Sequence, residues 1–120
     1  MLPNLYYQSY KQFAQMLSDL HEALAKAPED VQALRQSFLA AQQFFTQQIV
    51  SLDSNELDPT DEPRVRSYQT EISKQLHLLG IDVMFLQAAR QQQTAQNRQR
   101  QISQRLQTLI SYCNNVLLLQ

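Results

Sequence analysis

The sequence contains 120 residues, of which 18% are charged, and its formal net charge is −1. A chain of this length forms one domain, residues 1–120, and can bury a stable hydrophobic core without metals or disulfide bonds. Gly80 is its only glycine, which argues against phosphate-binding loops, hairpin sheets and nucleophile turns, because each of these structures uses glycine. We therefore expect an all-α protein that is not an enzyme and uses no cofactor.

The first two helices are predicted to form an antiparallel hairpin. In the first helix, apolar residues alternate spacings of four and three from Tyr6 to Ala27, which places them on one face. The second helix is predicted to begin at Pro28, because the first position of a helix needs no N–H, and Glu29 and Asp30 place negative charge at the positive end of its dipole. The apolar stripe of this second helix consists of Val31, Leu34, Phe38, Ala41, Phe45 and Leu52, widened by Phe44 and Ile49.

A polar loop is predicted between Leu52 and Arg64, where prolines, aspartates and an asparagine are typical turn residues. A calcium-binding loop starting at Asp53 would need an oxygen ligand at its fifth position, a glycine at its sixth and a glutamate at its last. The sequence has Leu57, Asp58 and Arg64 at these positions. We therefore interpret the segment as an acidic connector.

A third helix is predicted to begin near Pro63, with Thr60 or Asp61 as its cap, and to continue to Arg90. Its apolar side chains cover an arc of about 240°, whereas a surface helix is expected to cover a little over about 100°. Because monomers rarely leave such a broad apolar surface in water, we predict a homodimer. The candidate dimer-interface residues are Tyr68, Ile72, Leu79, Phe85 and Leu86.

The last segment allows two interpretations. A turn near Thr94 to Asn97 would give a compact antiparallel bundle of about four helices. Alternatively, a sevenfold apolar period that continues from Ile81 to Val116 would suit one continuous helix from Pro63 onward. We favour the bundle, because the continuous helix would be roughly 85 Å long and would extend far beyond its partners.

Charge is distributed unevenly along the chain. Three basic and nine acidic residues precede Arg64, whereas seven basic and two acidic residues lie from Arg64 onward. Arg90, Arg98 and Arg105 follow the last acidic residue and are therefore candidate contacts for an acidic protein partner. The alternative is that they complement acidic residues of the same chain or of a dimer. Nucleic-acid binding is disfavoured, because no aromatic residue lies between these arginines.

Asp82 lies in the middle of the apolar arc of the third helix, where an unpaired carboxylate would be costly. One interpretation is that Asp82 accepts a hydrogen bond from an arginine of another helix, such as Arg35 or Arg105, and fixes the helix register. The other is that it lies in a groove that receives a basic residue of a partner.

The remaining reactive residues predict no chemical site. His21 and His77 belong to no metal-binding pattern, and Cys113 lies among apolar positions, which is typical of a core residue. No segment shows a secretory leader or the roughly 18 successive apolar residues of a membrane span. We therefore expect a cytoplasmic protein that binds no metal and does not contact a membrane.

Four strings in the sequence carry a family resemblance: Ala41–Ile49, Arg66–Leu76, Ile81–Phe85 and Ser111–Asn114. In these strings the chain resembles the PatD family, small cyanobacterial proteins associated with control of heterocyst frequency. The resemblance covers roughly the last two thirds of the chain. The acidic loop from Asp53 to Glu62 does not share it.

The resemblance implies a non-enzymatic regulatory protein that binds FtsZ, the tubulin-like division protein, and modulates its assembly into filaments. Such a protein would link cell division to heterocyst differentiation. It implies no particular binding residues. The alternative, taken from the residues alone, is a structural helical-bundle subunit of a larger protein assembly.

Overall fold

The computed structural model describes residues 2–119, which form an antiparallel bundle of four α-helices and contain no strand. The helices are α1 (Asn4–Lys26), α2 (Val31–Phe44), α3 (Glu62–Ala88) and α4 (Gln92–Leu117). A π-helical segment, η1 (Phe45–Ile49), extends α2, and a short 3-10 helix, η2 (Ser54–Glu56), lies in the following loop. The predicted all-α bundle is confirmed.

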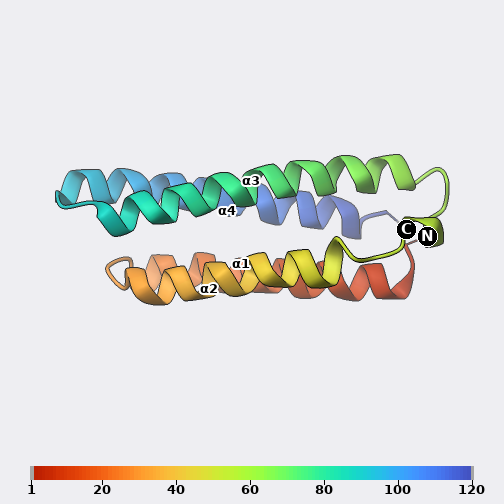
Figure 1. Cartoon of the computed structure of the whole chain (residues 1–120), viewed down its shortest axis with the longest axis horizontal. Coiled ribbons are helices and arrows are strands. Elements are labelled where there is room, and N and C mark those ends of the chain that lie inside the picture. Colours follow the sequence, from red (N-terminus) through yellow and green to blue (C-terminus); the bar gives the residue numbers. More distant parts are fainter. Residues whose placement is uncertain (1, 120) are drawn as a thin grey trace.

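The helices pack as two hairpins. Figure 1 shows α1 and α2 in one layer and α3 and α4 in the other. Around the bundle each helix contacts the next one in sequence, and α4 returns to contact α1. The molecule measures 50 × 20 × 19 Å. No helix within residues 2–119 is both long enough and apolar enough to cross a membrane.

Proline and aspartate determine the turn between α1 and α2. Ala27 leaves the helical conformation, with φ −140° and ψ 68°, because the ring of Pro28 disfavours a helical preceding residue. The prediction that the second helix begins at Pro28 is wrong. It begins at Val31, because the side chain of Asp30 accepts a hydrogen bond from the N–H of Ala33 at 3.1 Å and caps the first turn.

The C-terminal end of α2 widens into the π-helical segment η1. The N–H of Val50 donates to the carbonyl of Phe45, five residues earlier, at 3.0 Å. Each such turn contains one residue more than an α-helical turn. With this geometry both Phe45 and Ile49 are buried, while Val50 is exposed.

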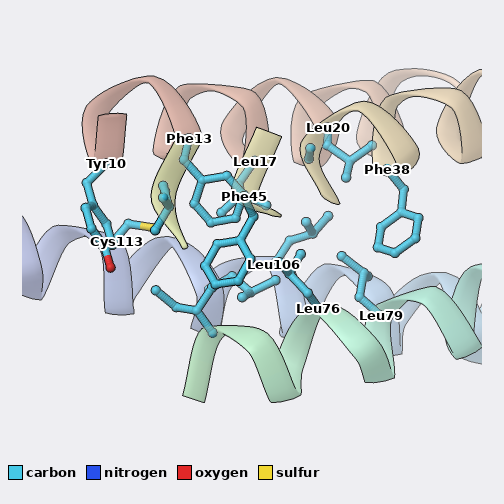
Figure 2. Packing of buried hydrophobic residues seen from close by; sticks show 14 of the residues in the cluster. Tyr10, Phe13, Leu17, Leu20, Phe38, Phe45, Leu76, Leu79, Leu106 and Cys113 are labelled. Carbon is cyan, nitrogen blue, oxygen red and sulfur yellow. The ribbon is translucent and has the colours of Figure 1, made fainter. Parts of the chain in front are cut away.

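One continuous cluster of buried side chains fills the bundle. Near its centre, Phe13 of α1 packs against Phe44 and Phe45, with ring centroids 6.3 and 5.4 Å apart, respectively. Aromatic pairs attract one another at these separations. Figure 2 shows Leu106 of α4 in the same cluster. Cys113 is also buried in this core, as predicted.

The chain turns between α3 and α4 earlier than predicted. Ala89 and Gln91 have extended backbone conformations, so residues Thr94–Asn97 lie inside α4 and not in a turn. The earlier turn gives α4 26 residues, which lets it follow α1 as far as the turn between α1 and α2. There the side-chain amide of Gln99 donates to the carbonyl of Pro28 at 3.2 Å. The interpretation as one continuous helix is therefore wrong.

The loop between α2 and α3 lies at the end of the bundle where both chain termini lie (Figure 1). Asp53 and Asp58 shape this loop by accepting hydrogen bonds, each of 2.9 Å, from the N–H groups of Asn55 and Thr60. The negative charge of the N-terminal half is concentrated here. We call the carboxylates of this loop and of the start of α3 the acidic tip: Asp53, Glu56, Asp58, Asp61 and Glu62.

Candidate functional site

Asp82 connects α3 to α4 through two arginines. Its side chain is buried, Nη1 of Arg98 lies 3.2 Å from Oδ1, and Nε of Arg105 donates to Oδ2. Arg105 also donates from Nη1 to Oε1 of Gln75 at 3.2 Å. These bonds compensate the desolvation of the carboxylate. The predicted bond from Arg105 is confirmed, and the second partner is Arg98, not Arg35.

The basic residues that were candidate partner contacts lie in different environments. The guanidinium carbon of Arg98 lies 4.6 Å from the ring centroid of Phe85, a cation–π geometry. The side chain of Arg98 is 37% exposed and that of Arg105 is 19% exposed, and both are engaged with Asp82. Arg90 lies exposed in the connection between α3 and α4. A partner contact for any of the three stays a prediction.

The candidate dimer-interface residues on α3 do not form one surface. Ile72, Leu79 and Leu86 are buried within a single chain, so they cannot also face a second copy of the folded protein. The ring of Tyr68 lies 5.9 Å from a tyrosine ring of α4. Phe85 is half exposed. The apolar arc of α3 is broad because α3 packs against both α2 and α4, and the prediction is wrong for the three buried residues.

Part of the apolar arc nevertheless remains uncovered. On α3, Met84 is 63% exposed and Ile81 is partly buried, whereas Phe85, which is 50% exposed, lies on the side of α3 that contacts Arg98 of α4. On the neighbouring α2, Leu39 is 43% exposed. We call Leu39, Ile81 and Met84 the α2–α3 face, because these three side chains lie between the two helices. The sequence analysis did not predict a role for Leu39 or Met84. Each is an apolar residue outside the apolar stripe of its helix, and this position could have indicated an exposed apolar side chain.

A groove of about 360 Å³ follows the α2–α3 face between the two helices. Its apolar lining includes Phe38, Leu39, Ile81 and Met84. The polar groups that border it are Arg35 and Gln42 of α2, and His77 and Gln87 of α3. The groove therefore has an apolar floor and a polar border whose only formal charge at neutral pH is positive.

Gly80 allows α2 and α3 to approach closely at the bottom of this groove. A Cβ atom at position 80 would lie 3.0 Å from Cζ of Phe38, which is closer than an ordinary contact between carbon atoms. Figure 2 shows Phe38 extending from α2 across the space toward α3. The ring of Phe38 packed on Gly80 forms the floor of the groove.

A serine and a histidine meet elsewhere in the bundle. Nε2 of His21 and Oγ of Ser103 lie 2.9 Å apart and connect α1 to α4. Both residues lie within helices, where the backbone N–H groups are used by the helix and cannot form an oxyanion site. Within residues 2–119, no group of three or more His, Cys, Asp or Glu side chains is placed to hold a metal ion. We interpret the pair as a hydrogen bond between helices.

Tyr10 and Cys113 form a second pair of polar groups inside the core. In the described part of the chain the hydroxyl of Tyr10 has no hydrogen-bond partner, and Figure 2 shows it beside Cys113. Burial raises the pKa of Cys113 to about 12 and raises the pKa of Tyr10 far above its ordinary value. A thiol held in its protonated form is a poor nucleophile. Cys113 is therefore a structural residue.

No protein-family model, no curated protein and no solved structure matches the chain. A functional proposal therefore depends on the surface described above and on the resemblance of the sequence strings.

Proposed function

We propose that this protein is a non-enzymatic regulatory protein that binds FtsZ and modulates its assembly into filaments, linking cell division to heterocyst differentiation. The observation that supports the proposal best is the exposed α2–α3 face. Buried side chains from all four helices described already form a continuous core, so the exposed Leu39 and Met84 are not needed to complete it. Contiguous apolar surface of this kind is typical of protein interaction sites.

The resemblance to the PatD family supplies the identity of the partner. A regulator of a polymer acts by binding its subunits, so the proposal requires a stable surface and no reactive group. The bundle offers such a surface on two packed helices, which hold side chains in position better than loops do. The proposal also places the protein in the cytoplasm together with FtsZ.

Homodimerisation belongs to the proposal as a way to bridge filaments, because two linked binding sites raise the effective concentration of the second one. Of the candidate dimer-interface residues, Phe85 and Tyr68 are the ones that the bundle leaves at least partly accessible. Sedimentation equilibrium of the purified protein tests this part separately. A protein that stays monomeric and still alters filament assembly would remove bridging and leave regulation in place.

Filament sedimentation and light scattering of purified FtsZ from the same organism, with and without the protein, test the proposal directly. We expect the protein to pellet with the filaments and to change the scattering signal. If the protein at roughly 10 μM neither pellets with the filaments nor changes the scattering signal, the proposal is overturned.

Charge-reversal variants of the arginines must be chosen so that the bundle still folds. Reversal of the charge of Arg98 or Arg105 would break the bonds to Asp82, so the exposed Arg90 and the exposed Arg100 of α4 are the better positions.

A second candidate is a structural subunit of a larger helical assembly, which the α2–α3 face also favours. The two candidates differ in the state of the isolated protein. A regulator should sediment as a discrete monomer or dimer, whereas a subunit should form higher oligomers or aggregate through its uncovered face. Sedimentation velocity distinguishes the two.

A further inference from the structure

We infer that the α2–α3 groove binds an amphipathic helical segment of a protein partner that carries acidic residues beside its apolar stripe. The inference deepens the proposed function and rests on it in one respect, namely that the partner is a protein. It specifies which surface of the bundle is used and what kind of segment occupies it.

The groove has the shape of a helix-binding site. Its lining residues on α3 repeat at helical spacing from His77 to Gln87, and those on α2 repeat in the same way from Arg35 to Gln42. Ten residues of α-helix extend roughly 15 Å, so the groove is as long as about three turns of a docked helix. Leu39 and Met84 stand exposed on opposite sides of it. Helices bind such grooves through apolar side chains at positions i, i+3, i+4 and i+7.

The charge around the groove selects the partner. Within α2, Arg35 is the only charged residue, and between Ile72 and Ala88 of α3 the ionisable residues are Lys74, His77 and Asp82. Asp82 is buried and bonded to two arginines of α4. The lining of the groove therefore contains one cation, Arg35, and no acidic side chain.

This charge pattern disfavours a second copy of the same chain as the occupant. Two copies that docked through the groove would place Arg35 of both chains in the same interface, and like charges across an interface are unfavourable. Acidic side chains beside the apolar stripe of a partner helix would instead pair with Arg35. They would also increase the rate of association at low salt.

A pair of designed peptides tests the inference. Each has about 16 residues, long enough for roughly four helical turns, with leucines at i, i+3, i+4 and i+7 and a fluorescent label. One carries glutamates beside the stripe and the other carries lysines at the same positions. Fluorescence anisotropy with the full-length protein measures both affinities. We expect the glutamate peptide to bind at least about tenfold more tightly than the lysine peptide.

Two variants locate the binding site. Leu39→Asp and Met84→Asp change exposed residues, so the bundle should still fold, which circular dichroism checks. Each should weaken binding of the glutamate peptide by at least about tenfold. The matched control is Leu5→Asp, which changes an exposed leucine of α1 and should leave the affinity unchanged.

Several results would overturn the inference: no binding of the glutamate peptide, equal binding of the lysine peptide, or unchanged binding by Leu39→Asp and Met84→Asp. Self-association of the protein that Met84→Asp abolishes would also overturn it, because the occupant would then be a second copy.

FtsZ sedimentation separates the inference from the proposed function. If the wild-type protein and Met84→Asp pellet equally with FtsZ filaments, the function stands and the groove is not its site. If the peptide binds as expected but FtsZ does not, the groove stands and the proposed partner is wrong.

Discussion

Asp82 shows how strongly one residue can constrain this bundle. Its carboxylate holds two arginines of α4 that lie seven residues, or about two helical turns, apart, so it fixes both the rotation and the axial position of α4 relative to α3. Removal of one partner from a buried ion pair is usually strongly destabilising. The effect is smaller here because Arg98 is partly exposed to water.

We expect Asp82→Asn to lower the free energy of unfolding by about 2 kcal/mol, because two arginines lose their anionic partner. Urea denaturation followed by circular dichroism measures the change. Glu22→Gln is the matched control, since it breaks an exposed ion pair with Lys26 that contributes little. Equal effects of the two substitutions would show that the cluster around Asp82 does not stabilise the fold.

Tyr10 leads to the opposite expectation. Its buried hydroxyl has no partner within residues 2–119, so the folded state bears the cost of removing that group from water. Tyr10→Phe should raise the free energy of unfolding by about 1 kcal/mol, since phenylalanine keeps the ring and removes the unsatisfied group. Thermal and urea denaturation test this. A loss of stability would indicate that an internal water or the thiol of Cys113 satisfies the hydroxyl.

The pKa of Cys113 leads to a prediction about alkaline pH. The pKa is raised from 9.0 to about 12 in the folded protein, so the unfolded chain loses this proton first as the pH rises. Stability should therefore be fully present below about pH 9 and fall above it, by up to about 1.4 kcal/mol per pH unit for this group. Urea denaturation at pH 8 and at about pH 10 measures the slope.

Cys113→Ala provides the control for that pH dependence. The variant loses packing at every pH, but it should lose less additional stability between pH 8 and about pH 10 than the wild type does. Tyr10, whose pKa is also raised by burial, contributes in the same direction at somewhat higher pH. An identical slope in wild type and variant would contradict the assignment to the thiol.

At the level of single residues, the sequence predicted the chemistry of Asp82 but not its full geometry. A carboxylate among apolar neighbours needs a donor, and Arg105 was a predicted donor. Arg98 was missed because its position relative to Asp82 depends on where α3 ends, and that turn was predicted several residues too late. The local backbone preference of Ala89 and Gln91, which form the actual turn, is not distinctive in the sequence.

Among the elements, the π-helical segment η1 is the feature that hydrophobic periodicity could not reveal. The spacing from Phe45 to Ile49 fits an ordinary helix, yet the bond from Val50 to Phe45 contains an extra residue. Removal of one residue from a π-helical turn leaves the number of residues of an α-helical turn, so the residues that follow should keep their direction relative to those before. The segment therefore predicts an unusual tolerance to deletion.

Deletion of Gln47, an exposed residue of η1, should restore an α-helical turn and lower the melting temperature only slightly. Deletion of Gln36, an exposed glutamine within regular α2, should be severe, because it rotates all following residues of α2 by about 100°. Circular dichroism melting curves compare the two. Equal loss of stability would mean that η1 is needed for packing as it stands.

The third helix explains why an apolar arc alone was a poor guide to the oligomeric state. The arc was assigned to a second chain, but α2 and α4 cover most of it within the monomer. The part that remains exposed, around Met84 and Phe85, could not be separated from the buried part by periodicity. That separation needs the positions of the neighbouring helices.

Across the whole molecule, α2 is attached by the fewest buried side chains. It buries three apolar residues, whereas α1 and α3 each bury six and α4 buries five. A helix that buries less apolar surface against its neighbours opens locally at a lower free-energy cost. We expect the amides of α2 to exchange with deuterium faster than those at the centres of the other helices described, as native-state hydrogen exchange can measure. Earlier exchange of α1 or α4 would contradict this order.

The same measurement connects dynamics to the groove. Because α2 forms one wall of the groove, a bound helical segment should slow exchange in α2 more than in α1. The glutamate peptide described above is the probe, and its lysine counterpart is the control. Protection spread equally over the bundle would indicate general stabilisation and not occupation of the groove.

The acidic tip gives the two ends of this rod different surroundings in solution. Five carboxylates lie within ten residues at one end, and the pKa of Tyr6 on α1 is raised by burial and by the charges of three of them, Asp53, Glu56 and Glu62. At about 0.1 M salt the field of these charges extends only about 10 Å, far less than the 50 Å length of the molecule. An acidic body that approaches this end of the rod therefore meets repulsion, and the repulsion does not reach the opposite end. Two molecules repel each other when their acidic tips meet, so association of these two ends is disfavoured.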